Sequence, residues 1–255
     1  MNVIRTENPS QRQLKDLLAL QNTCQSHDQI SLTLPLEEDC LCYLLYDKGN
    51  LLSALCAVFD EGTGWECYGC TLPDERRKGY FRLLLEHLEA EAEDSELIFP
   101  AYPSCSDAIE ALNAIGAVFW YSEHMMELSL SSPLPAPAFK VPGLSEEITI
   151  QPKPDRLRQE KDYRFFHRGS LTGQCFLDFS GSQVYFYGFE ICKELRDRGL
   201  GGACLTKLLK SLSSLPDSVR PKRILLQVSG QNLPALRLYE KTGFQPFESL
   251  SYYVY

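Results

Sequence analysis

The stretch Arg196-Asp197-Arg198-Gly199-Leu200-Gly201-Gly202 joins an apolar, strand-like run, VYFYGFEICKEL (184–195), to a helical pattern. Glycines let backbone N–H groups converge, because no Cβ interferes. The following helix adds unpaired N–H donors and the positive end of its dipole. The stretch therefore suits a phosphate group, although it is neither a Walker loop nor the dinucleotide fingerprint GxGxxG. The alternative interpretation is a plain glycine-rich turn with solvated arginines.

A second motif follows about one strand later, in the sequence QNLPALRLYEKTGF (231–244). Together the two motifs make the segment 186–244 resemble the GNAT superfamily of acyl-CoA-dependent N-acyltransferases. That family has a strand, then Arg/Gln-x-x-Gly-x-Gly/Ala opening a helix, then a strand, then Asn-x-x-Ala-x-x-Leu-Tyr-x-x-x-Gly-Phe. The matching residues here are Arg196, Gly199, Gly201, Asn232, Ala235, Leu238, Tyr239, Gly243 and Phe244.

The resemblance implies an α/β (α+β) fold in which helices flank a mixed sheet. It implies acetyl transfer from acetyl-CoA to a primary amine, carried by a small molecule or a peptide, in the C-terminal half. No HExxH or similar histidine pair is present in the sequence, so we expect no catalytic metal. A non-catalytic acyl-CoA-binding or regulatory protein of the same fold remains the alternative function.

Site roles follow from the same resemblance. Tyr239 is expected to protonate the departing thiolate, and Asn232 to touch the pantetheine or orient its loop. The remaining predicted cofactor-binding residues cradle the pyrophosphate or line the pantetheine arm: Phe189, Ile191, Lys193, Arg196, Arg198, Gly199, Leu200, Gly201 and Gly202.

Glu190 is the candidate general base, because it is the only carboxylate inside the strand before the turn. Strand residues alternate between faces, so Glu190 points away from a coenzyme lined by its two neighbours unless a bulge redirects it. The alternative is a structural pair with Arg164 or Lys193.

The first half repeats this order of elements. Gly79 aligns with Gly199 at an offset of 120 residues, and Gly116 with Gly243 at an offset of 127. A repeat of this length predicts a tandem duplication with two mixed sheets rather than a solenoid.

The first copy of the motifs is degenerate. Phe81 replaces the second glycine of the turn, Cys105 stands in the place of Asn232, and Leu112 in the place of Tyr239. Leucine cannot donate a proton, so the first half is predicted to support the second rather than to catalyse.

The domain boundary is predicted in the proline-rich segment SLSSPLPAPAFKVPG (129–143). We expect an N-terminal domain over 1–130, a linker over 131–144 and a C-terminal domain over 145–255. Residues 1–130 carry 8 basic and 22 acidic side chains, whereas residues 131–255 carry 17 and 12. The second half is therefore the one suited to an anion, unless the halves simply dock on each other.

The whole chain has 255 residues, a net charge of −9, 44% hydrophobic and 23% charged residues. No stretch reaches the ~20 apolar residues of a membrane helix, and the N-terminus becomes polar at once. An acidic chain argues against general nucleic-acid binding. We expect a cytoplasmic monomer or dimer that binds neither nucleic acid nor membrane.

Ten cysteines stand mostly in apolar runs. Without an export signal, the simplest interpretation is reduced, buried thiols. The alternative is a four-thiolate zinc site built from Cys40, Cys42, Cys67 and Cys70.

Two hairpin turns are also predicted. The first is Lys48-Gly49-Asn50, and the second is Ser170-Leu171-Thr172-Gly173.

Overall fold

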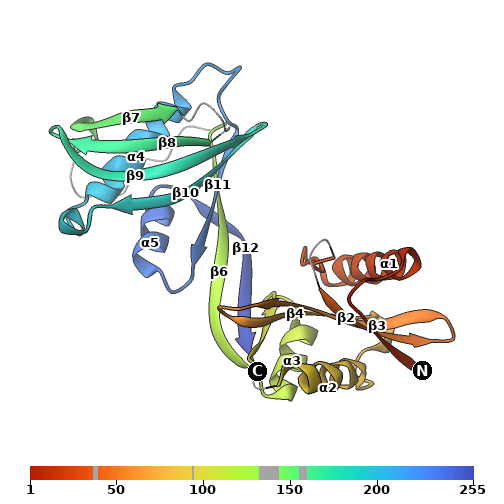
Figure 1. The fold of residues 1–255 in the computed structure, drawn as a ribbon. Helices are drawn as coiled ribbons and strands as arrows, with labels where there is room; N and C mark the ends of the chain where they lie inside the picture. Colours follow the sequence, from red (N-terminus) through yellow and green to blue (C-terminus); the bar gives the residue numbers. More distant parts are fainter. Residues whose placement is uncertain (37–39, 94, 132–143, 155–159) are drawn as a thin grey trace. The chain divides into compact units, whose positions relative to one another are not determined.

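The computed structural model describes residues 1–36, 40–93, 95–131, 144–154 and 160–255. These residues form five α-helices and twelve strands (Figure 1), which confirms the predicted mixed α/β fold. They fall into two compact units. The N-terminal unit comprises residues 1–122 with 250–255, and the C-terminal unit comprises residues 123–249.

In the N-terminal unit, helices cover both faces of one sheet. Its strand order is β1-β2-β3-β4-β5-β12, and only the β4–β5 pair is parallel. Leucines of α1 pack on one face and leucines of α2 on the other. The elements are β1 (Asn2–Thr6), α1 (Gln11–Asp28), β2 (Leu41–Asp47), β3 (Asn50–Asp60), β4 (Gly64–Thr71), α2 (Tyr80–Ala92), β5 (Leu97–Ala101) and α3 (Ser106–Ile115).

The C-terminal unit has the strand order β6-β11-β10-β9-β8-β7, and here only β10–β11 is parallel. Its described residues contain no counterpart of α1. The elements that lie wholly or partly in this unit are β6 (Val118–Ser129), β7 (Ile148–Pro154), β8 (Glu160–His167), β9 (Ser170–Ser180), β10 (Gln183–Ile191), α4 (Leu200–Ser213), β11 (Arg223–Ser229), α5 (Leu233–Lys241) and β12 (Gln245–Val254).

The terminal strands of the two sequence halves are exchanged. Strand β6 comes from the first half but pairs antiparallel with β11, from Ser129 opposite Arg223 to Glu123 opposite Ser229. Strand β12 comes from the second half, and its end pairs antiparallel with β5. Each compact unit therefore contains part of a strand from the other half of the repeat.

This exchange makes the compact units differ from the predicted domains. The predicted N-terminal domain runs to residue 130, but Met126, Leu128 and Leu130 are buried in the core of the C-terminal unit. Burial of these apolar side chains fixes where the segment belongs, which the proline-rich composition could not show. Most of the predicted linker, residues 132–143, lies outside the described residues.

The two hairpin turns occupy equivalent places in the repeat. Lys48 and Gly49 have φ of 48° and 88°, so the first turn lies where it was predicted. The second is formed by Arg168 and Gly169, with φ of 51° and 82°. The prediction of a turn at 170–173 is wrong, because those residues already belong to β9.

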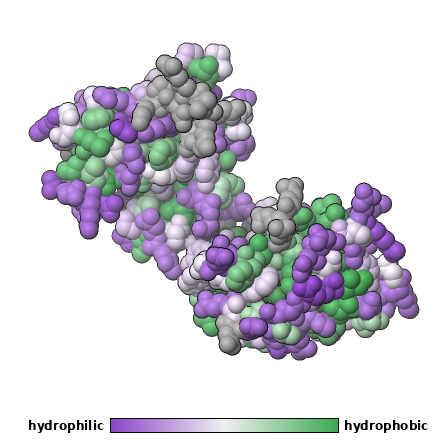
Figure 2. Space-filling view, viewed as in Figure 1, coloured by the Kyte–Doolittle hydropathy of each residue, from purple (hydrophilic) through white to green (hydrophobic). Residues whose placement is uncertain are grey.

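Apolar side chains fill three buried clusters, one in the C-terminal unit and two on the opposite faces of the N-terminal sheet. On the visible face of each unit, hydrophilic side chains interrupt the hydrophobic ones (Figure 2). No helix among the described residues is long and apolar enough to cross a membrane.

All ten cysteines are free thiols, and most are buried. The four-thiolate zinc arrangement is not formed. Cys67 packs on the α2 face of the sheet, whereas Cys40 and Cys42 lie on the α1 face beside Cys56. Because successive residues of a strand point to opposite faces, Cys67 cannot join the other two.

Candidate functional site

The turn that opens α4 presents unused backbone donors. Asp197 and Gly199 take φ of 60° and 77°, which turns the chain sharply from β10 into the helix. Gly199 is the N-cap and offers no side-chain cap, and the first helical bond runs from Ala203 N to Gly199 O at 3.1 Å. The amides of residues 200–202 precede that bond, so they remain available to an anion.

Arg196 anchors this turn rather than extending from it. Its Nε donates to the carbonyl of Ile191 at 3.0 Å. The equivalent residue of the first copy, Arg76, makes the same bond to the carbonyl of Thr71 at 3.3 Å. Arg198 is exposed and forms no ion pair among the described residues, so it is the arginine free to meet a phosphate.

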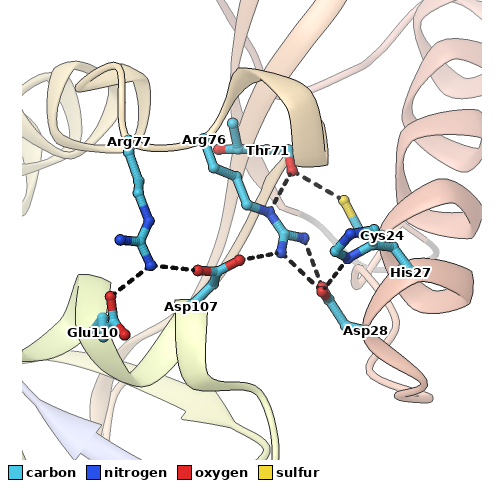
Figure 3. A network of polar contacts seen from close by, with 8 residues as sticks. All are labelled: Cys24, His27, Asp28, Thr71, Arg76, Arg77, Asp107 and Glu110. Atoms are coloured by element: carbon cyan, nitrogen blue, oxygen red, sulfur yellow. Dashed lines mark hydrogen bonds and ion pairs between the residues drawn. The ribbon is translucent and has the colours of Figure 1, made fainter.

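The equivalent turn of the N-terminal unit is neutralised by carboxylates (Figure 3). Arg76 donates to both oxygens of Asp28, at 2.8 and 2.6 Å, and to Asp107 at 2.9 Å. Arg77 donates to Asp107 at 3.1 Å and to Glu110 at 2.8 Å. The positive charge that a phosphate would meet is therefore already balanced within this unit.

In the C-terminal copy, other residue types stand at the positions of Asp107 and Glu110. With the offset of 127 residues, Asp107 corresponds to Pro234 and Glu110 to Arg237. Arg237 is exposed and forms no ion pair among the described residues. Of the two positions of α3 that carry these carboxylates, one is thus neutral in α5 and the other is positive and unpaired among the described residues. This difference could have been predicted from the repeat alone.

The ion pair between Arg76 and Asp28 stabilises the N-terminal unit, because the two side chains are only 15% and 10% exposed. Burial disfavours ionisation, but hydrogen bonds to Arg76 and His27 outweigh it and lower the pKa of Asp28. We expect Asp28→Asn to cost about 3 kcal/mol of the unfolding free energy at neutral pH. Because the folded-state pKa is depressed, this stabilisation is present above the unfolded carboxyl pKa and is lost as the pH falls through the folded one.

Urea unfolding followed by tryptophan fluorescence measures this directly, because both tryptophans, Trp65 and Trp120, lie in the N-terminal unit. The control Glu86→Gln breaks an exposed pair with Arg82 and should cost no more than about 0.5 kcal/mol. Equal losses in the two variants would contradict a special role for Asp28.

Strands β10 and β11 separate where the predicted pantetheine arm would lie. Their parallel register runs from Gln183 opposite Arg223 only as far as Tyr185 opposite Leu225. Beyond this point β10 carries a bulge between Tyr187 and Glu190. The separation leaves backbone groups of β10 without a strand partner on that side, which is the geometry that an extended, amide-containing ligand can use.

The predicted cofactor residues of β10 divide into core and surface positions. The ring of Phe189 contacts those of Phe165 and Phe186, at 5.9 and 5.6 Å between centroids. Ile191 packs against the same core, and its carbonyl already accepts from the anchoring arginine. Lys193 is exposed at the start of the turn.

Tyr239 lies in the core of the C-terminal unit and is only 8% exposed. Its ring contacts those of Phe186 and Phe244 edge to face. Burial, with a smaller contribution from Cys175, raises the pKa of Tyr239 to about 12. The phenol therefore stays protonated at neutral pH, which is the form that an acid catalyst requires.

Glu190 is exposed, and its Oε1 accepts a hydrogen bond from Gln174 Nε2 at 2.7 Å. The bulge allowed for in the sequence analysis is present next to it. The predicted structural pair with Arg164 or Lys193 is wrong: Gln174 lies directly opposite Glu190 in β9 and takes that place. The carboxylate remains open to solvent and to an incoming amine.

Asn232 is the N-cap of α5, and its Oδ1 accepts from the amide of Ala235 at 3.3 Å. The corresponding Cys105 caps α3 without any side-chain bond. Of its two expected roles, the structure therefore supports orientation of the loop, since the cap sets the start of the helix that carries Tyr239.

A cavity of about 420 Å³ lies in the N-terminal unit, between α1, β4, β5 and α3. The sequence analysis did not predict it. Phe81 lies on its wall and against Gly69, where an added Cβ would come within 2.9 Å of the ring. Leu112 also lines it, so the cavity has no hydroxyl at the position that Tyr239 holds in the other copy.

Comparison with known proteins identifies the class of fold. Residues 146–244 match the acetyltransferase (GNAT) family, and the C-terminal unit therefore belongs to the GNAT superfamily. A search of curated proteins finds no match.

Solved structures match over the whole chain. A GCN5-related N-acetyltransferase from Sphaerobacter thermophilus is 14% identical with a TM-score of 0.71, covering 99% of this chain and 95% of that one. A tandem GNAT protein from the clavulanic acid biosynthesis pathway is 15% identical with a TM-score of 0.63, covering 100% and 98%. A GNAT-family acetyltransferase from Colwellia psychrerythraea is 12% identical with a TM-score of 0.56, covering all of both chains. The chain thus has the fold of tandem GNAT proteins.

Proposed function

We propose that this chain is an acyl-CoA-dependent N-acetyltransferase with its acetyl-CoA site and active centre in the C-terminal unit. One observation supports this placement above the others. The two copies of the turn share a backbone path, but only the C-terminal copy leaves its arginine, Arg198, without a carboxylate partner among the described residues.

Different residues of the C-terminal unit bind the coenzyme and transfer protons. Free amides of residues 200–202 and the guanidinium of Arg198 hold the pyrophosphate. The unpaired edge of β10 holds the amide-bearing arm. Acetyl-CoA supplies the activated acyl group. Glu190, open to solvent, takes a proton from the acceptor ammonium so that the neutral amine can attack.

Tyr239 completes the proton balance. The amine nitrogen bonds to the acyl carbon and releases its second proton to solvent, the carbon–sulfur bond breaks, and the thiolate leaves. The buried phenol supplies a proton to that sulfur and later recovers one from solvent. The acceptor is a primary amine on a small molecule or a peptide, and the N-terminal unit is a structural support.

The test is a calorimetric titration of acetyl-CoA into the full-length protein. We expect one site per chain. Arg198→Glu should weaken binding about tenfold or more, because it removes a charge-assisted bond of about 1.5–3 kcal/mol. Lys78 holds the equivalent position in the N-terminal turn and is paired with Glu75 at 2.8 Å, so Lys78→Glu should leave the affinity unchanged.

The stoichiometry decides between the units. Two sites per chain would contradict the supporting role of the N-terminal unit. No binding up to millimolar concentration would overturn the proposed function. Binding without transfer to any amine in an acceptor screen would indicate the non-catalytic acyl-CoA-binding protein instead.

A further inference from the structure

Three buried thiols converge on the α1 face of the N-terminal sheet. The sulfur atoms of Cys40, Cys42 and Cys56 all lie within 4.8 Å of one another. The separation is 3.3 Å between Cys40 and Cys42 and 3.2 Å between Cys42 and Cys56. All three side chains are at most 3% exposed. None of them takes part in the proposed acyl transfer.

Two neighbouring strands hold these sulfurs in place. Cys42 of β2 lies directly opposite Cys56 of β3, and Cys40 precedes Cys42 by two residues, on the same face. Metal–sulfur bonds of about 2.3 Å place three sulfurs around one ion about 4 Å apart. Two of the sulfur–sulfur distances are somewhat shorter than this value, and the third is at most 4.8 Å, so a modest separation of the side chains would form the site.

The donor set indicates the metal. It is sulfur only, it lies in an apolar core with leucines of α1, and no fourth His, Cys, Asp or Glu joins it among the described residues. Structural zinc is almost always four-coordinate. A soft monovalent ion is satisfied by two or three thiolates, and thiolates select Cu(I).

We propose that Cys40, Cys42 and Cys56 form a structural Cu(I) site in the N-terminal unit. Each ligating thiol loses its proton to solvent as its sulfur–copper bond forms, with no change in oxidation state. The charge of the ion offsets part of the cost of ionising thiols in the core. The ion ties β2 to β3 beneath α1.

A thiol binds a metal ion as its thiolate, so each ligand must lose its proton on binding. Binding should therefore tighten as the pH rises.

The cavity of the N-terminal unit adjoins this apolar core. Cys24 and Leu34 belong both to the core and to the wall of the cavity. A metal ion that came from the cavity would have to pass this shared wall, because a buried site needs an entry path.

The test uses the reduced full-length chain without oxygen, and copper supplied as a complex with a chromophoric Cu(I) chelator. We expect the protein to take one Cu(I) per chain from the chelator and to unfold at a higher temperature when loaded. Cys42→Ser should lose this equivalent, and Cys56→Ala should do the same. Far-UV circular dichroism establishes that each variant is folded.

Two matched controls address the other thiols. Cys67→Ser changes an equally buried cysteine on the opposite face of the sheet, and Cys24→Ser changes one on the same face. Both should retain one Cu(I) per chain. Loss of copper in either control equal to that in Cys42→Ser, retention of copper in Cys42→Ser and Cys56→Ala, or preferential uptake of Zn(II) at the same stoichiometry would overturn the proposal. None of these readouts depends on acetyl transfer, so failure of the copper site and failure of the proposed function can be distinguished.

Discussion

Gly201→Phe is expected to abolish detectable acetyl-CoA binding, a loss of ~100-fold or more (about 3 kcal/mol). A Cβ at position 201 lies 3.6 Å from Ile191 Cγ1 and 3.7 Å from Leu238 Cδ2, so the space beside the backbone ends there. The equivalent Phe81 packs against Gly69, but Phe189 stands at that position here, so a phenyl ring must displace side chains or enter the space proposed for the coenzyme. Calorimetry on the full-length protein measures the effect, with the melting temperature recorded for every variant.

The repeat supplies matched controls for this substitution. Gly201→Ala adds only ordinary van der Waals contacts and should keep binding within about threefold, a change of well under 1 kcal/mol. Phe81→Gly makes the reverse exchange at the equivalent position of the N-terminal turn and should leave the affinity unaltered. Loss of binding in Phe81→Gly, with binding retained in Gly201→Phe, would move the acetyl-CoA site to the N-terminal unit.

Tyr239→Phe is expected to lower kcat by ~10²-fold while leaving the dissociation constant of acetyl-CoA unchanged, as for loss of a general acid. The substitution keeps the ring and its edge-to-face contacts with Phe186 and Phe244, so the fold should be retained. Free coenzyme A should be measured chromatographically, because a thiol reagent would also react with the protein's own cysteines.

The pH profile gives an independent readout for this acid. Because burial raises the pKa of Tyr239 to about 12, its protonated form persists past pH 10, where an ordinary tyrosine is half ionised. The alkaline limb of kcat should show no step at the ordinary tyrosine pKa. Tyr163→Phe changes another half-buried phenol of the same unit and serves as the control. Equal kcat in wild type and Tyr239→Phe, with a true acceptor, would exclude Tyr239 as the acid.

Local sequence predicted the turn of the C-terminal unit well. Gly199 was expected to open a helix after an apolar strand, and it does so as a left-handed N-cap. This succeeds because the conformation depends on the glycine itself and on its immediate neighbours. The mixed α/β architecture and the tandem repeat follow for the same reason, since hydrophobic period and turn residues are local signals.

The division into compact units could not be predicted in this way. Composition identified a proline-rich boundary after residue 129, yet the strand before it completes the other sheet. The alternation of apolar residues in β6 fits any sheet with a matching edge, and only the core formed around Met126 and Leu128 selects one.

By itself, the sequence determined the family that the C-terminal half resembles, the two motifs that carry this resemblance, and the glycine turn that opens α4. Only the tertiary structure showed that the arginines of the N-terminal turn are paired with carboxylates, whereas Arg198 of the C-terminal turn is not. Asp28 reaches Arg76 across 48 residues of chain, and Asp107 does so across 31. The same holds for Cys56, which meets Cys42 only because β2 and β3 are in register. Ion pairs and thiol contacts depend on distance in space, and a separation along the chain does not fix that distance until the core has packed.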